Sequence, residues 1–172
     1  TIRSLSADVV LLGGDYVAFE ANDIASLLPH LESLRPPLGI YGVLGNHDLT
    51  TDSARVAAEL EGAGVTMLTN RAVCLPAPHD DVWLCGLDDP TLGHPNADAA
   101  FDGVGDTRIV LMHSPDGLLA IGKHDFDVAL CGHTHAGQVA LPWGNAIVVP
   151  KGRLSRRYLH GTYRVGTHSE ML

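Results

Sequence analysis

Short apolar runs alternate with a helix-like segment along the first part of the chain. Residues Ala7 to Gly13 (ADVVLLG), apart from Asp8, and Leu38 to Leu44 (LGIYGVL) form apolar runs, which are typical of strands buried on both faces of a sheet. Between them, Asn22 to Leu34 places an isoleucine and several leucines on one helical face, and Pro36 and Pro37 end the segment. This pattern predicts a strand, a helix and a second strand.

A second helix and a series of short strands follow. Asp52 or Ser53 can cap a helix that runs to about Glu61, and Gly62 and Gly64 end it. The later apolar segments predict strands at 65–68, 72–75, 82–87, 108–112 and 128–131, a short helix at 116–121, and a hairpin of 139–141 and 146–149 around the turn 142–145. The alternation predicts an α/β layered fold with a mixed sheet in one domain over residues 1–172.

Four predicted strands are each followed at once by polar residues that suit metal binding. Open α/β sheets bind ligands beyond the carboxyl ends of their strands, so these residues are expected to converge at one edge. Aspartate offers an anionic oxygen, asparagine a carbonyl oxygen and histidine a neutral nitrogen, a donor set that suits Mn, Fe or Zn. The candidate ligands are Asp15 after Gly14, Asn46 in Gly45-Asn46-His47-Asp48, His113, and His133 with His135 in Gly132-His133-Thr134-His135.

Each motif also has an ordinary structural interpretation. Gly-Asp is a common turn, Asn-His-Asp is compatible with the start of a helix, and a single histidine is more often structural than a ligand. His133 and His135 are two residues apart, and on an extended backbone they would point to the same side. The metal interpretation is favoured because all four motifs stand at strand ends together.

In this order, the four motifs resemble those of the calcineurin-like metallophosphoesterase superfamily. The extension of the last motif through Ala136, Gly137 and Gln138 is similar to a branch that includes the YkuE-like bacterial enzymes and relatives that cleave UDP-diacylglucosamine, although Ala136 is more usually glycine there. The resemblance covers about Ala7 to Tyr163. It implies an αββα sandwich with mixed sheets and a dinuclear metal centre.

The resemblance also implies a role for each candidate residue. Asp15 would bridge two divalent ions, Asn46, His113 and His133 would complete one site, and His135 would belong to the other. His47 would stand near the leaving group and Asp48 would orient it. The implied reaction is hydrolysis of a phosphodiester or pyrophosphate bond by a bridging hydroxide between two metals.

One family motif is missing from the sequence. The family opens with Asp-x-His on a strand before the Gly-Asp strand, but the six residues that precede Ala7 contain neither aspartate nor histidine. We therefore expect a domain that lacks its first strand and helix and is shortened at the C-terminal end, with an incomplete second metal site. The alternative function is a non-catalytic metal-binding remnant. A metallo-β-lactamase relative is disfavoured, because Ala136 follows where that family has His-x-His-x-Asp-His.

Composition narrows the set of partners. The net charge of -9 disfavours nucleic acid and would repel an anionic substrate unless bound cations reverse the local field. The expected substrate is small and phosphorylated or phospholipid-like. A membrane surface is a further possible partner, through a basic cluster that could equally be a solvated face. This cluster consists of Lys151, Arg153, Arg156 and Arg157. Related branch members are often exported or membrane-bound, whereas a cytoplasmic location is the alternative.

The remaining polar residues match no ligand motif. Asp88 and Asp89, before Pro90, resemble a loop that borders the site in the family, although a plain turn is the simpler interpretation. The three cysteines are an odd number without zinc-like spacing, so we expect buried free thiols; they are Cys74, Cys85 and Cys131. The other histidines are expected at the surface; they are His30, His79, His94, His124, His160 and His168.

Overall fold

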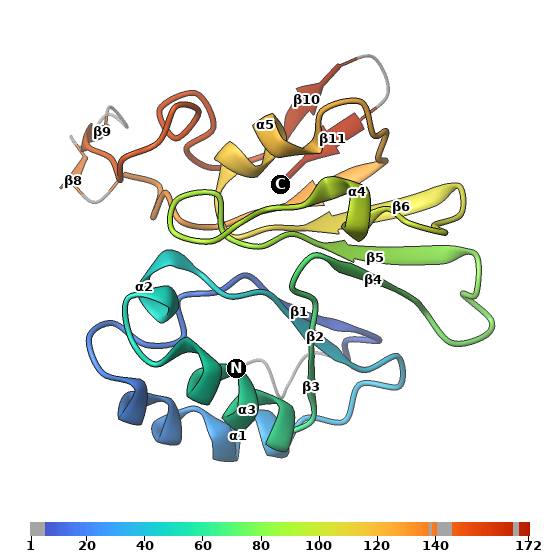
Figure 1. The fold of residues 1–172 in the computed structure, drawn as a ribbon, viewed down its shortest axis with the longest axis horizontal. Coiled ribbons are helices and arrows are strands. Elements are labelled where there is room, and N and C mark those ends of the chain that lie inside the picture. The colour runs from blue at the N-terminus through green and yellow to red at the C-terminus, as the bar shows by residue number, and fades with distance from the viewer. Residues whose placement is uncertain (1–5, 138, 141–145, 167–168) are drawn as a thin grey trace.

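A computed structural model describes residues 6–137, 139–140, 146–166 and 169–172. Figure 1 shows two sheets lying face to face, with helices on the outer side of each. The strands are β1 (Val10–Leu12), β2 (Ile40–Gly42), β3 (Val65–Met67), β4 (Arg71–Cys74), β5 (Val82–Gly86), β6 (Thr107–Leu111), β7 (Val128–Leu130), β8 (Val139–Ala140), β9 (Ala146–Val148), β10 (Tyr163–Val165) and β11 (Ser169–Met171). The helices are η2 (Ala21–Ser26), α1 (Leu28–Glu32), α2 (Asn46–Leu49), α3 (Ser53–Gly62), α4 (Ala97–Ala100), η3 (Pro115–Gly117) and α5 (Leu118–Ile121).

The first sheet has the order β1-β2-β3, and its three described strands are parallel. Apolar runs form the strands of this sheet, because successive residues of a strand face opposite sides of the sheet and both sides are covered. In β1, Leu11 packs between the two sheets, whereas Val10 and Leu12 pack against the outer helices.

The second sheet has the order β10-β11-β7-β6-β5-β4 and is mixed. Strands β5, β6, β7 and β11 run parallel, and β4 and β10 are antiparallel to their neighbours. Gly86 of β5 is in register with Leu111 of β6, and Leu111 with Leu130 of β7. The segments after these three strands therefore leave the sheet at the same edge.

Three apolar clusters separate the layers. The cluster between the sheets contains Tyr41, Val43, Leu68, Leu84 and Leu111. A second lies between the first sheet and its helices, and a third packs α4 and α5 on the outer face of the second sheet. This arrangement confirms the predicted αββα layered class.

Local differences from the sequence prediction have identifiable causes. The segment expected as one helix over 22–34 divides at Leu27 into η2 and α1. Pro29 lies in the first turn of α1, where a backbone N–H would have no partner within the helix and its absence in proline costs nothing. Strands β10 and β11 were not predicted, because their residues, Tyr-Arg-Val and Ser-Glu-Met, do not form a continuous apolar run. The hairpin of β8 and β9 is present, and its expected turn at 142–145 lies outside the described residues.

The longest described helix, α3, has ten residues. Within the described part of the chain, no helix has the length and apolar character needed to cross a membrane.

The three cysteines are free thiols, but only one is fully buried. Cys85 is inaccessible to solvent, whereas Cys74 and Cys131 are half-buried, so the expectation of three buried thiols was only partly right. Burial raises the pKa of Cys85 and of Cys131 to about 11.

Candidate metal centre

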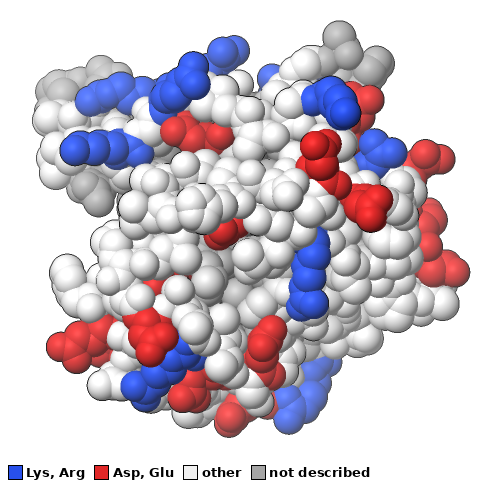
Figure 2. Space-filling view, viewed as in Figure 1, with Lys and Arg blue, Asp and Glu red and all other residues white. Residues whose placement is uncertain are grey.

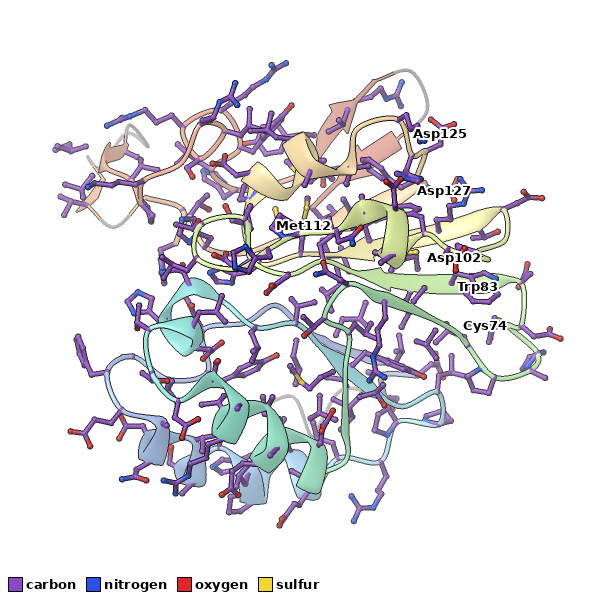
Figure 3. All side chains as sticks on the ribbon, viewed as in Figure 1. Cys74, Trp83, Asp102, Met112, Asp125 and Asp127 are labelled. Atoms are coloured by element: carbon purple, nitrogen blue, oxygen red, sulfur yellow. The ribbon has the colours of Figure 1, made fainter. Side chains whose placement is uncertain are left out.

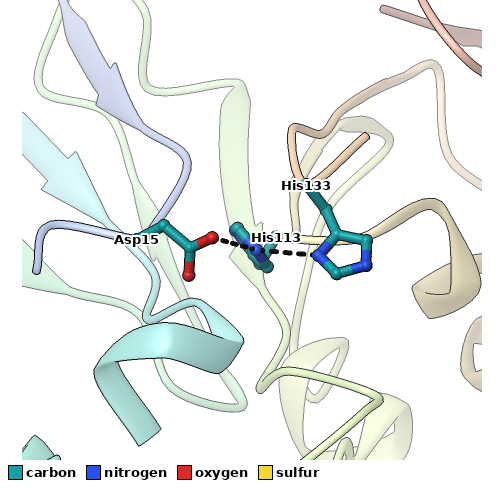
Figure 4. Close-up of side chains that lie close together, drawn as sticks. All are labelled: Asp15, His113 and His133. Atoms are coloured by element: carbon teal, nitrogen blue, oxygen red, sulfur yellow. Dashed lines mark hydrogen bonds and ion pairs between the residues drawn. The ribbon is translucent and has the colours of Figure 1, made fainter. Parts of the chain in front are cut away.

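Three side chains from both sheets meet at the carboxyl ends of their strands. Asp15 follows β1, His113 follows β6 and His133 follows β7 (Figure 4). Nε2 of His113 lies 3.2 Å from Oδ2 of Asp15 and 3.3 Å from Nδ1 of His133. All three potential donor atoms lie within 4.8 Å of one another, so one ion placed between them could contact all three.

Asn46 adds a fourth donor to the same point. Its Oδ1 lies 3.1 Å from Nε2 of His113, and Asn46 is the first residue of α2. The structure therefore brings together Asp15, Asn46, His113 and His133, the four residues that the family resemblance assigns to one metal. One carboxylate, one amide oxygen and two imidazoles are a donor set suited to Mn, Fe or Zn.

Backbone carbonyls fix the orientation of both imidazole rings. Nδ1 of His113 lies 2.7 Å from the carbonyl oxygen of Gly13, and Nε2 of His133 lies 3.3 Å from that of Lys151. A carbonyl can only accept, so we assign the N–H of each ring to that side. The opposite nitrogens then present lone pairs to the centre, as in metal sites whose histidines are oriented by outer hydrogen bonds.

Burial and the neighbouring charges set the protonation of the cluster. Burial alone would raise the pKa of Asp15, but the hydrogen bond and charge of His113 outweigh it, so that pKa lies below the usual value. Burial alone would lower the pKa of His113, but Asp15 and the Gly13 carbonyl raise it above the usual value. Burial lowers the pKa of His133, which favours the neutral ring that binds metals.

The ligand-bearing turns adopt left-handed backbone conformations. The φ angles of Asp15, His133 and His135 are 58°, 68° and 51°. Such values are uncommon outside glycine and concentrate at functional sites. The expectation that His133 and His135 share one extended backbone was therefore wrong, because the chain turns at both residues.

His135 is not among the four converging donors. It is exposed, and it does not belong to the described donor cluster. Together with His133, Tyr158 and Tyr163 it lines a hollow of about 340 Å³. His135, the residue expected to bind a second metal, therefore borders the same hollow as His133 without belonging to the group of closely spaced donors.

Asp48 has a different set of partners from the one expected. Its carboxylate is fully buried and accepts the N–H groups of Gly45, Asp15, Tyr16 and Val17 at 2.8–3.1 Å. The ring of His47 is held instead by Ala18, whose carbonyl oxygen lies 3.1 Å from Nδ1. In these contacts Asp48 fixes the loop that carries Asp15 rather than the ring of His47.

Two glycines allow the segments of the site to approach each other closely. A Cβ at Gly14, where φ is 93°, would lie 2.6 Å from the backbone nitrogen of Gly45. A Cβ at Gly45 would lie 2.5 Å from the nitrogen of Asp15 and 2.8 Å from Cε1 of His113. Side chains do not tolerate such distances, so this contact requires glycine.

The other singled-out histidines of the described residues do not belong to the donor cluster. His30, His79, His94 and His160 are exposed as expected, and His168 lies outside the described residues. His124 is half-buried, lies 2.8 Å from a carboxylate oxygen of Asp98 and stacks on Phe101. These contacts give His124 a structural role that the sequence pattern did not indicate.

The Asp88-Asp89 segment forms a turn, as the simpler interpretation predicted. Both oxygens of Asp88 accept backbone N–H groups, from Asp89 and His94. Asp89, however, is fully buried, which a plain surface turn does not require. Sequence reasoning placed this residue near the site but gave no signal of its burial.

The basic cluster lies on a loop that is attached to the site. Lys151, Arg153, Arg156 and Arg157 are exposed, and Figure 2 shows basic side chains gathered at the upper left, over β8, β9 and the loop that follows. The carboxylate of Asp116 accepts the N–H groups of Arg153 and Leu154, and the Lys151 carbonyl contacts His133. The backbone of this basic loop is thus in contact with a proposed metal ligand.

The fold and the converging donors agree with the outcome of a comparison with known protein families. The family model of calcineurin-like phosphoesterases matches residues 1–137, and the chain belongs to this family. The phosphodiesterase YaeI of Escherichia coli is 32% identical over 139 residues, which are 78% of this chain and 51% of YaeI. The uncharacterized metallophosphoesterase YkuE of Bacillus subtilis is 30% identical over 176 residues, 97% of this chain and 60% of YkuE.

A more distant relative carries a specific substrate in its name. The UDP-2,3-diacylglucosamine pyrophosphatase LpxG of Chlamydia trachomatis is 26% identical over 190 residues, 83% of this chain and 58% of LpxG. The chain spans about half to three fifths of the length of these relatives. No solved structure shows a significant match to it.

Proposed function

We propose that this chain forms the metal-binding core of a hydrolase that cleaves phosphodiester or pyrophosphate bonds. The observation that carries the proposal is the convergence of Asp15, Asn46, His113 and His133, which come from two different sheets. Family membership supports metal-dependent phosphoester hydrolysis. Residues 1–172 would be one partial domain of this type.

The donors fit a divalent cation of the Mn, Fe or Zn class. When bound, such an ion supplies positive charge that polarises a phosphoryl group and lowers the pKa of water. Asp15, Asn46, His113 and His133 would hold it, and the carbonyls of Gly13 and Lys151 would keep the two rings in the required tautomers.

His47 is the proposed proton donor. Its Nδ1 donates to the carbonyl of Ala18, which leaves Nε2 for a substrate atom. When the ring is protonated, Nε2–H can donate to the leaving oxygen, a contribution of about 10²–10⁴-fold in similar enzymes. Asp48 supports this arrangement indirectly, because it holds the backbone of Gly45 and Asp15 in place.

A second cation would have fewer ligands in this chain. Asp15 and His135 are the residues that the family pattern assigns to it, and His135 is exposed and outside the donor cluster. We therefore propose one tight cation site and a second, weak one. Calorimetric titration with Mn²⁺ that revealed two sites of similar high affinity would contradict this assignment.

The substrate is proposed to be anionic and phosphorylated, with a phospholipid-like molecule as the finer hypothesis. The basic cluster beside His133 supports an anionic group, and the name of LpxG provides a precedent for a sugar-lipid pyrophosphate. A membrane surface could present such a substrate to the same cluster.

The first experiment measures Mn²⁺-dependent hydrolysis of bis(p-nitrophenyl) phosphate by the wild type and His133→Ala. We expect the substitution to lower kcat/KM by at least about 100-fold, because it removes a ligand and disturbs the neighbouring ring. His79→Ala is the matched control, since His79 is exposed between β4 and β5. It should retain wild-type activity.

The same experiment separates hydrolysis from metal binding alone. A folded wild type that binds Mn²⁺ but turns over neither this ester nor a pyrophosphate would support the alternative of a non-catalytic remnant. Equal activity of the wild type and His133→Ala would remove the proposed centre from the reaction.

A further inference from the structure

Asp89 occupies the same edge of the second sheet as the two histidines of the candidate centre. Strands β5, β6 and β7 are parallel neighbours, with Gly86, Leu111 and Leu130 in register. Asp89 comes three residues after the end of β5, His113 two after β6 and His133 three after β7. The topology therefore places a second carboxylate in the row that already contains two proposed ligands.

The carboxylate of Asp89 is buried with half of its hydrogen-bonding capacity unused. The residue is 0% exposed, and its Oδ1 accepts the N–H groups of Thr91 and Leu92 at 2.9 Å. Its Oδ2 is buried and has no hydrogen-bond partner among the described residues. Burial of an unpaired carboxylate oxygen is unfavourable, so this arrangement calls for a compensating interaction.

The turn itself does not provide that compensation. Asp88 already accepts N–H groups with both carboxylate oxygens, and Asn70 accepts those of Asp88 and Asn96. An amide at position 89 could accept the same two N–H groups through its Oδ1. The negative charge of Asp89 is therefore not needed to form the loop.

The electrostatic environment connects Asp89 to the centre. Asp89 carries a carboxylate at the same edge of the sheet as the rings of His113 and His133, after the strand next to β6. Its negative charge would attract a cation held between them.

The proposed ligands carry too little charge to neutralise a divalent ion. Asp15 is anionic, whereas Asn46 and the two imidazoles are neutral donors, so a bound 2+ ion would leave one net positive charge. Excess charge in a poorly solvated site is unfavourable unless a nearby counter-charge balances it. A single additional carboxylate would bring the sum to zero.

We propose that Asp89 is a positioning residue of the cation site, which balances the charge of the ion held by Asp15, Asn46, His113 and His133 without ligating it. The inference rests on the proposed metal site. This role explains why a carboxylate with a free oxygen lies in the interior. Its burial destabilises the metal-free protein, and cation binding offsets that destabilisation. Asp89 thus favours divalent over monovalent ions.

The test compares Asp89→Asn with the wild type in two measurements, the melting temperature without metal and the Mn²⁺ affinity by calorimetry. Asparagine keeps the shape and the Oδ1 acceptor but removes the charge. We expect the metal-free variant to melt at the same or a higher temperature, and its Mn²⁺ affinity to fall about 10–100-fold, as for other residues that surround metal ligands.

Asp127→Asn is the matched control, because it removes the same charge at the other end of the sheet. Asp127 is exposed, precedes β7 and accepts the N–H of Arg108. Figure 3 shows it well to the right of Met112, the residue directly before His113. This control should keep wild-type Mn²⁺ affinity. Asp89→Ser is the second variant, since its hydroxyl can also accept from the turn.

Each outcome distinguishes a role of Asp89 in cation binding from a purely structural role in the turn. Wild-type Mn²⁺ affinity in Asp89→Asn, or a lower melting temperature with an undiminished response to Mn²⁺, would overturn the proposal and make Asp89 a structural turn residue. Failure of both variants to fold would have the same meaning. A wild type that does not bind Mn²⁺ would refute the metal site itself and this inference with it.

Discussion

At the scale of single residues, the protonation of Asp15 and His113 is coupled. Their side chains are 3.2 Å apart, and Asp15 and His113 are 15% and 2% exposed. The pKa of Asp15 is lowered below 3.8 and that of His113 is raised above 6.5. In the metal-free protein this pair stabilises the fold, and a cation held by Asp15 and His113 would take the place of the proton between them.

The pair should give the metal-free protein a defined pH dependence. The contribution of His113 to the free energy of unfolding is fully present below pH 6.5 and is lost as pH rises through the raised pKa of this residue. The contribution of Asp15 is present above pH 3.8 and is lost as pH falls through its lowered pKa. Urea unfolding of wild type and Asp15→Asn should therefore differ most, by about 1–3 kcal/mol, between these values. A difference that grows above pH 7 would contradict the assignment.

At the scale of elements, the site depends on how closely the turn before α2 approaches the turn after β1. Asp48 of α2 holds both turns through four backbone N–H groups. Gly45 leaves the space in which Asp15 and His113 meet. The positions of the ligands are thus set by backbone contacts between two loops rather than by the strands alone.

Gly45→Ala should separate these loops. The added Cβ would lie 2.5 Å from the nitrogen of Asp15 and 2.8 Å from Cε1 of His113, so we expect a loss of about 1–3 kcal/mol in stability and weaker Mn²⁺ binding. Gly62→Ala is the control. It lies at the end of α3, where a Cβ meets nothing within 4 Å, and alanine there should be neutral or slightly stabilising. Denaturant unfolding and calorimetry measure both effects.

At the scale of the whole molecule, the candidate centre joins the two sheets. Asp15 and Asn46 follow strands of the first sheet, and His113 and His133 follow strands of the second (Figure 1). A cation bound by all four would connect layers that otherwise meet through an apolar interface. Metal binding should therefore be linked to global stability.

Mn²⁺ should raise the melting temperature of the protein, and a chelator should reverse the effect. At a free ion concentration 100 times the dissociation constant, linkage gives about 2.7 kcal/mol. For a chain of this size that corresponds to a rise of roughly 5–10 °C, measured by calorimetry. Asp15→Ala should abolish the rise, and an equal rise in that variant would place the ion elsewhere.

The sequence by itself determined the main elements and the chemistry of the site. Apolar runs specify β1, β2, β5 and β7 and, after Thr107 and Arg108, the rest of β6, because a strand buried on both faces is apolar at successive positions. The polar residues directly after these runs identified the candidate donors, since the carboxyl ends of parallel strands share an edge.

Only the tertiary structure decided how those residues meet. The left-handed turns at Asp15 and His133, the exposure of His135 and the backbone partners of Asp48 depend on contacts between loops that are distant in the sequence. The burial of Asp89 likewise follows from packing, which no local pattern encodes. Periodicity specifies which face of an element is buried, but the distances between side chains are set when the sheets and their loops pack together.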